Sequence, residues 1–300
     1  LRPARDKMAE ILPIDPSIVP ATLFANDMGG APLAKEIAKN DTVGMFNAMV
    51  VSSMMGATIS FTIPFALGCL EKAKQKDFTL GLLCGIVTIP VGCLISGIFC
   101  KINIVTLLLN LMPLIIFAII IAIGLLVVPK VCIKIFNVLG IIIKAIISLG
   151  LILGIIELLI GIKPIETAAD IFDAGNICIN AAVVMSGAFP LLFVISKLLA
   201  KPMEKLGNVI KINNTSTLGF ISTLANNVTT FEMMKDMDRK GTVLNSAFAV
   251  SASFVLADHL AFTLAFEASY LFPMMIAKIT AGLSAIIFAA IIFKKTEKSI

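Results

Sequence analysis

Seven long apolar stretches, separated by short charged turns, dominate the pattern of hydrophobic and polar positions along the chain. A helix needs about 20 residues to cross the ~30 Å hydrocarbon core of a bilayer, and each stretch is long enough to do so. The pattern therefore predicts an all-α polytopic membrane protein in which residues 1–300 form a single transmembrane domain. The predicted spans are 44–69, 79–99, 103–128, 138–162, 177–200, 243–267 and 270–293.

Two further segments, 16–39 and 213–236, are only moderately apolar and carry small and amide residues in their middle. Gly, Asn and Asp favour non-helical backbone. In a membrane such backbone persists only where protein or a wet cavity covers it, so we expect two re-entrant or broken-helix hairpins. Their centres are Ala25-Asn26-Asp27-Met28-Gly29-Gly30 and Ala225-Asn226-Asn227-Val228-Thr229-Thr230.

The two hairpin segments also resemble each other at an offset of 200 positions, which extends into the following span. This pattern predicts one repeat over about 16–69 and a second over about 213–267; chance likeness between apolar sequences is the alternative. Five predicted spans lie between the hairpins, so the repeats would be inverted, as in many transporters. Identical pairs include Asn26/Asn226, Val43/Val243 and Ser53/Ser253.

Composition supports the membrane assignment, since 58% of the residues are hydrophobic and only 14% are charged, against about 25% charged in soluble domains. This excludes an ordinary soluble enzyme, a disordered tail and a coiled coil. The net charge of +5 fits the Lys/Arg excess of cytoplasmic loops better than nucleic-acid binding. If 213–236 is re-entrant, most Lys and Arg lie on the side of the C-terminus, so we expect a cytoplasmic C-terminus. A full crossing of 213–236 would reverse that excess.

Few ionisable residues lie at membrane depth, and a charge at the bilayer centre costs about 2.5–3.5 kcal/mol on insertion scales. Lys144 can reach the interface, and Lys278 can act as a structural counter-ion of Asp258. Asp27 and His259 are not explained in these ways, and for Asp258 the ion pair with Lys278 is the alternative; we predict that all three bind a substrate.

Amides at the two predicted breaks, Asn26, Asn226 and Asn227, are further candidate substrate ligands, although each could instead cap a helix. Small, hydroxyl and aromatic neighbours could support them, with plain core packing as the alternative for each Phe. These supporting residues are Phe24, Gly29, Gly30, Ser53, Thr229, Thr230, Phe231 and Phe254.

Known catalytic and cofactor motifs are missing from the sequence. His259 is the only His and no H-E-x-x-H spacing exists, so we expect no metal site. A G-x-S-x-G elbow and a phosphate-binding loop are also absent, and no cofactor is expected. The remaining enzymatic alternative is an intramembrane reaction that uses Asp258 and His259 as acid and base.

The sequence around these residues resembles the EutH family of bacterial ethanolamine transporters. The resemblance rests on five short motifs whose order and spacing extend over nearly the whole chain. They are 23–30, 53–58, 222–227, 234–237 and 247–252, the last followed by Asp258-His259-Leu260.

The resemblance implies ethanolamine uptake across the bacterial inner membrane by a facilitator or secondary carrier. Its partners would be ethanolamine and the lipid bilayer, with a homo-oligomer left open. Asp27 and Asp258 would hold the ammonium, and Asn and Ser side chains the hydroxyl. A carrier for another small solute, such as an amino acid or carboxylate, is the alternative. Family members are usually longer at the N-terminus, and because the chain begins at Leu1 we expect further spans upstream.

Overall fold

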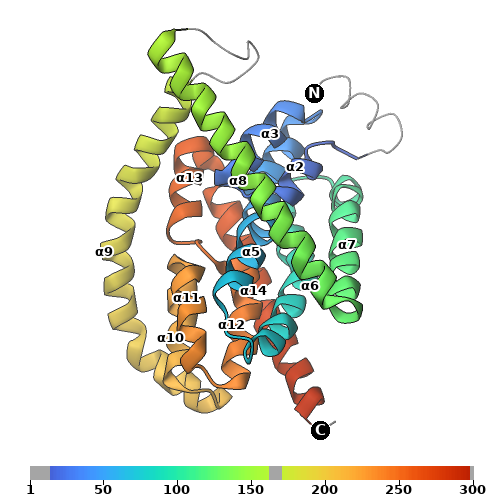
Figure 1. Ribbon diagram of the computed structural model, residues 1–300, viewed down its shortest axis with the longest axis vertical. Helices are drawn as coiled ribbons and strands as arrows, with labels where there is room; N and C mark the ends of the chain where they lie inside the picture. The colour runs from blue at the N-terminus through green and yellow to red at the C-terminus, as the bar shows by residue number, and fades with distance from the viewer. Residues whose placement is uncertain (1–13, 162–170, 298–300) are drawn as a thin grey trace.

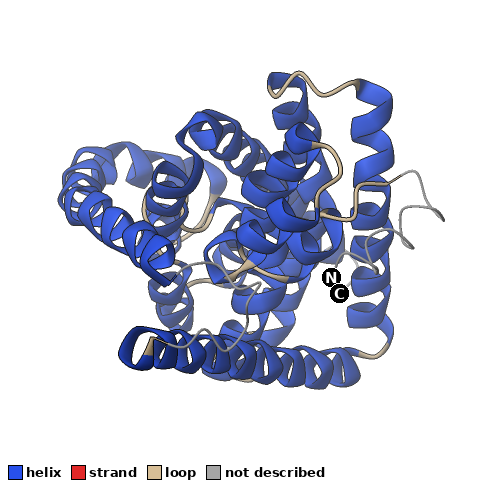
Figure 2. Cartoon of the chain, turned by 90° about the horizontal axis from the view of Figure 1, so that it is seen from above, coloured by secondary structure: helices blue, strands red, loops and turns tan. Residues whose placement is uncertain are grey.

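The computed structural model describes residues 14–161 and 171–297, and every regular element in these ranges is a helix (Figure 2). Six helical stretches are long and apolar enough to cross a membrane, which confirms an all-α polytopic membrane protein. The first half contains α2 (Ile18–Leu23), η1 (Asn26–Met28), α3 (Gly30–Ile37), α4 (Asp41–Phe46), η2 (Asn47–Gly56), η3 (Thr58–Thr62), α5 (Ile63–Cys69), α6 (Gln75–Phe99) and α7 (Ile104–Val127). The second half contains α8 (Pro129–Ile160), α9 (Ile171–Ile210), α10 (Asn214–Ala225), α11 (Asn227–Met233), η4 (Met234–Asp236), α12 (Arg239–Ala252), α13 (Asp258–Glu267), η5 (Ala268–Tyr270) and α14 (Leu271–Glu297).

A central group of helices is surrounded by helices that present apolar side chains outward. In the stretch Asp41–Ala66, 83% of the most apolar window is buried, whereas in Ile171–Leu199 of α9 the share is only 6%. Most exposed large apolar residues lie on α7, α8 and α9. Figure 1 shows α9 bowed along one edge and α8 crossing the molecule diagonally. Lipid is the natural solvent for these outer faces.

The centre is held by α6, α12 and α14, which pack on one another through small residues. A side chain added at Gly81 or Gly85 would meet α12, and one added at Gly92 would meet the backbone of Ala277 in α14. Small residues at these crossings let membrane helices approach closely and gain dispersion contacts. These three helices therefore form a tightly packed support for the breaks described below.

The first predicted hairpin is formed by α2, η1 and α3. Its two ends lie together, because the carboxylate of Asp15 accepts hydrogen bonds from the backbone N–H groups of Lys39 (3.0 Å) and Asn40 (2.9 Å). At its tip Gly29 has a positive φ of 93°, a conformation that favours glycine. The segment thus enters and leaves at the same end of the molecule.

The second predicted hairpin is formed by α10, α11 and η4, and a carboxylate again holds its ends together. Asp238 accepts hydrogen bonds from the backbone of Asn213 (3.0 Å) and from the Ser216 hydroxyl (2.7 Å). Figure 1 shows α2 and α3 at the upper end of the molecule, and α10 and α11 at the lower end. The two hairpins therefore extend inward from opposite ends.

The prediction of one continuous span over 243–267 is wrong. Helix α12 ends at Ala252 and α13 begins only at Asp258, with Phe254 at a positive φ of 64° between them. Two N–H groups in this gap donate to the end of α10: Phe254 N to Thr223 O (3.2 Å) and Leu256 N to Leu224 O (2.9 Å). The end of α10, in the second hairpin, supplies carbonyl groups that accept these hydrogen bonds in place of the carbonyl groups of a continuous helix. The break is therefore stable inside the membrane.

The span that follows the first hairpin is continuous but has unusual winding. Residues Asn47–Gly56 and Thr58–Thr62 form π-helix, a rare geometry that is frequent at functional sites. Gly56 lies against the backbone of the first hairpin, since a Cβ there would collide with the carbonyl group of Phe24. The sequence analysis did not predict this winding.

We expect Gly56→Ala to lower the stability of the protein by about 1–3 kcal/mol, the usual cost of overpacking a core. Gly187→Ala in α9 is the control, because a Cβ at Gly187 meets nothing within 4 Å. Thermal unfolding in detergent measures both. Equal melting temperatures for the two variants would contradict this packing.

Candidate functional site

A cavity of about 150 Å³ lies where three interrupted or unusually wound segments meet. They are the break in the first hairpin, the π-helical span and the gap between α12 and α13. Three of the six residues proposed as ligands line it, together with one predicted supporting residue. The lining is Ala25, Asp27, Met28, Ala57, Phe61, Phe254, Asp258 and His259.

Ionisable side chains converge on this cavity from two elements. His259 Nε2 lies 4.0 Å from Asp27 Oδ1, and the side chain of His259 is only 2% exposed while that of Asp27 is 31% exposed. Asp258 acts electrostatically on Asp27. Neighbouring residues on an intact helix point about 100° apart, but Asp258 and His259 begin α13 and both reach the cavity.

A buried lysine on α14 completes the group of charges. Lys278 is 1% exposed, and its Nζ donates a 2.6 Å hydrogen bond to the carbonyl oxygen of Ser53 in the π-helical span. The lysine interacts electrostatically with Asp27 and His259. The sequence analysis gave Lys278 as a possible counter-ion of Asp258; in the structure the charge of Asp27 favours the Lys278 ammonium.

The formal charges of this group leave a negative excess. Asp27 and Asp258 each contribute one negative charge, Lys278 contributes one positive charge, and His259 is counted as neutral. One more positive charge would balance the cavity. Unbalanced charge in a low-dielectric setting is costly, so the arrangement favours a small monovalent cation over an anion.

Two amides at the hairpin tips retain unused hydrogen-bonding capacity within the described part of the chain. Asn26 is fully buried, and neither its amide nitrogen nor its amide oxygen has a partner. Asn227 Nδ2 donates to the Thr62 hydroxyl (3.0 Å), but its Oδ1 has none. The Nδ1 atom of His259 is similarly unpaired. Buried polar groups of this kind need a partner, which a ligand could supply.

Other predicted residues have structural roles. Asn226 caps α11 by accepting a 2.7 Å hydrogen bond from Val228 N. Thr230 bonds to Thr223 and to Gly219 O, and Phe231 packs in the core against Phe65 and Phe78.

The remaining supporting residues take part through their backbone or lie elsewhere. Ser53 contributes its carbonyl, while its hydroxyl bonds to Val50 O (2.9 Å). Gly30 lets its own helix pass close to the Phe24 carbonyl. Thr229 is exposed. None of Phe24, Gly29, Gly30 and Thr229 is among the residues that line the cavity.

Two residues at the site were not predicted as ligands. Phe61 packs edge-on against Phe254 with 5.7 Å between the ring centroids, and Phe254 in turn lies 5.1 Å from the His259 ring. Lys278 was noted only as a charge at membrane depth that could pair with Asp258. That isolated charge was a usable signal, whereas nothing distinguishes Phe61 from other Phe residues of apolar spans.

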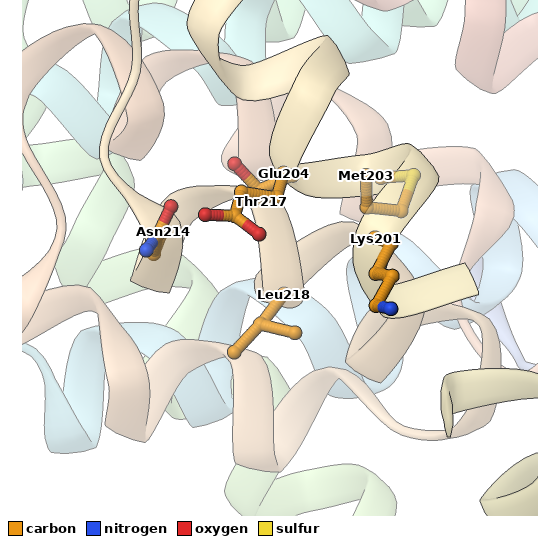
Figure 3. A pocket seen from close by; sticks show the side chains of 6 residues that line it. All are labelled: Lys201, Met203, Glu204, Asn214, Thr217 and Leu218. Atoms are coloured by element: carbon orange, nitrogen blue, oxygen red, sulfur yellow. The ribbon is translucent and has the colours of Figure 1, made fainter. Parts of the chain in front are cut away.

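Another cavity, of about 220 Å³, lies between α9 and α10 (Figure 3). These two helices meet near the lower end of the molecule in Figure 1. It is lined by Lys201, Met203, Glu204, Asn214, Thr217 and Leu218. Its two charged residues, Lys201 and Glu204, are exposed, so this cavity has no buried ionisable group such as His259 in the first. Among the described residues, no three His, Cys, Asp or Glu side chains are grouped so as to hold a metal ion.

Apolar spans around a charged cavity at broken helices define a polytopic membrane protein of the transporter class. Residues 1–292 match the family described as "Ethanolamine utilisation protein, EutH", and the chain belongs to this family. No solved structure matches it.

Relatives from several bacteria resemble the chain over most of its length. It is 42% identical over 272 residues to "Probable ethanolamine permease EutH" of Listeria monocytogenes, covering 91% of this chain and 73% of the relative. It is 36% identical over 312 residues to the Escherichia coli protein of the same name, with coverage of 96% and 76%. The "Uncharacterized protein YxeR" of Bacillus subtilis is 35% identical over 276 residues, with coverage of 92% and 75%.

We expect Asn26→Leu to leave the stability of the substrate-free protein unchanged, or to raise it by up to about 1–3 kcal/mol. The replacement removes a buried amide that has no partner and keeps a similar shape.

Asn47→Leu is the matched control, because the Asn47 amide bonds to Ser17 and exchanges two hydrogen bonds with Asn110. That variant should lose about 1–3 kcal/mol. Thermal unfolding without substrate compares them, and a larger loss for Asn26→Leu would show that Asn26 is a structural residue.

Proposed function

We propose that this protein carries protonated ethanolamine across the inner membrane of a bacterium. The observation that carries the proposal is the cavity at the helix breaks, which is lined by two carboxylates, while only one ammonium, that of Lys278, lies behind its wall. Membership of the EutH family and the names of its relatives agree with this substrate. Ethanolamine in its protonated form is a monovalent cation that brings the missing charge.

The cavity offers a separate set of groups to each end of this substrate. Asp27 and Asp258 can accept charge-assisted hydrogen bonds from the ammonium, and the faces of Phe61 and Phe254 can attract the same charge. The hydroxyl can bond to His259 Nδ1, which has no other partner among the described residues. Asn26 is a further candidate for the hydroxyl; it is fully buried between Ala25 and Asp27, which line the cavity, but is not itself among the lining residues. The substrate would then replace the water that normally surrounds both of its ends.

The arrangement of the hairpins supports a carrier that opens alternately to each side. The first hairpin extends from one end and the second from the other, and α13 contacts η1 while the α12–α13 gap contacts α10. In our proposal the segments 16–69 and 213–267 are inverted repeats, and their relative motion exposes the site first outside and then inside.

The distribution of positive charges supports a cytoplasmic C-terminus. Lys74, Lys240 and Lys294 lie at the ends of elements gathered near the lower end of the molecule, where α14 finishes. Lys74 and Lys240 also hold neighbouring carbonyl groups there. Because cytoplasmic loops carry an excess of Lys and Arg, we assign this end to the cytoplasm.

We expect Asp27→Asn or Asp258→Asn to reduce uptake of labelled ethanolamine into proteoliposomes by about 10- to 100-fold. This corresponds to a lost charge-assisted hydrogen bond worth about 1.5–3 kcal/mol. Asp41→Asn, at an exposed position at the start of α4, should retain uptake.

The same assay tests the alternative functions. Excess carboxylates or amino acids should not inhibit the wild-type protein, whereas unlabelled ethanolamine should. Inhibition by carboxylates alone would contradict the proposal. Recovery of chemically altered label would instead indicate an enzyme.

Topology can be tested with single Cys residues in a variant whose native Cys are replaced by Ala. A membrane-impermeant maleimide added to intact cells should label Lys101→Cys, and should label Lys294→Cys only after permeabilisation. Both positions are exposed and lie at opposite ends of the central helices. The reverse pattern would overturn the assigned orientation.

A further inference from the structure

We infer that Lys278 sets the charge of the substrate that the site accepts, by cancelling one of the two carboxylates. This inference rests on the proposed function, because it concerns the same cavity. It assigns to Lys278 a selectivity role that is separate from direct contact with substrate, since Lys278 is not among the residues that line the cavity.

The position of Lys278 prevents its ammonium from reaching water at a membrane surface. It lies seven residues into α14, about 10 Å along the helix axis, and only 1% of its surface is exposed. Its neighbours on the same helix, Ala277 and Ala281, are fully buried against α6. The lysine cannot extend to the interface as surface lysines do, so its charge is fixed inside the protein.

A hydrogen bond fixes the position of the Lys278 ammonium. The Ser53 carbonyl accepts one N–H of the ammonium at 2.6 Å, and an ammonium has three such donors. Ser53 belongs to the π-helical span, and Ala57 in the same span lines the cavity. Lys278 therefore lies directly behind the site, held by the segment that forms part of the cavity wall.

Its electrostatic partners belong to the site itself. Asp27 attracts the Lys278 ammonium, and His259 interacts with it. In the described part of the chain, the ionisable groups at this cavity are Asp27, Asp258, His259 and Lys278. With Lys278 the formal charge is −1, which one ammonium balances. Without Lys278 it would be −2, which a substrate with two ammonium groups balances better.

Ethane-1,2-diamine tests this inference because a second amine replaces the hydroxyl of ethanolamine with little change in size. Uptake of labelled ethanolamine is measured at neutral pH with each compound as competitor, and the diamine is counted by the concentration of its doubly protonated form. The wild-type protein should prefer ethanolamine. Lys278→Met should shift the preference toward the diamine by at least about tenfold, as expected for one charge at an effective dielectric constant of about 20. Lys278→Arg should keep the wild-type preference.

A second variant restores the charge balance. The double variant Asp258→Asn with Lys278→Met has a formal charge of −1 again. Its uptake should be low because Asp258 is lost, but the uptake that remains should again be inhibited more strongly by ethanolamine than by the diamine. This variant also removes the unbalanced charge, which keeps the test valid if Lys278→Met alone does not fold.

The outcomes separate this inference from the proposed function. If the wild-type protein does not take up ethanolamine, the proposed function fails. If the wild-type protein takes it up but folded Lys278→Met and the double variant share its preference, Lys278 is only a structural residue and the inference is overturned. Weaker binding of both compounds by Lys278→Met would also overturn it, because the lysine would then help to hold the substrate.

Discussion

The need to satisfy backbone hydrogen bonds away from water governs the centre of this protein. Hydrocarbon provides no hydrogen-bond partners for free N–H and C=O groups. Another part of the chain therefore has to supply partners wherever a helix is interrupted. The gap between α12 and α13 is matched by carbonyl groups at the end of α10. The first hairpin rests against Gly56, where the absence of a side chain lets two backbones touch. The interruptions therefore occur together, and the cavity lies where they meet.

Rigid packing around these interruptions explains how charges can be kept inside the membrane. The glycine-lined crossings of α6 with α12 and α14 hold α14 close to the π-helical span. That contact brings the ammonium of Lys278 onto the Ser53 carbonyl. The outer helices α8 and α9 supply no residue to the lining of the cavity, and their apolar faces are suited to lipid. The charged cavity and the tightly packed helices that support it thus belong to the inner set, whereas the outer set faces lipid.

The sequence was informative where single residues differ sharply from their surroundings. Apolar stretches of spanning length predicted the helical membrane fold, and Gly, Asn and Asp in two weakly apolar segments predicted the hairpins. Carboxylates at membrane depth predicted Asp27 and Asp258 beside His259. The break after Ala252 was not predicted, because Ser253 to Ala257 are compatible with a helix and only α10 supplies the alternative partners. The π-helical winding and the contact of Lys278 with Ser53 depend equally on tertiary neighbours, which no local pattern encodes.

The carboxylates that hold the hairpin ends together also bear on how the protein is made. Asp15 and Asp238 bond to backbone groups at the other end of their own hairpin, so the two ends of each hairpin emerge at one surface of the membrane. In the proposed orientation, the second hairpin can therefore insert after its neighbouring spans without moving a charged loop through the lipid. In the proposed orientation, the second hairpin would never leave the compartment in which it is synthesised, whereas the first would be exported whole before it folds inward. The two halves of the site would then be completed from opposite sides, at different stages of biogenesis.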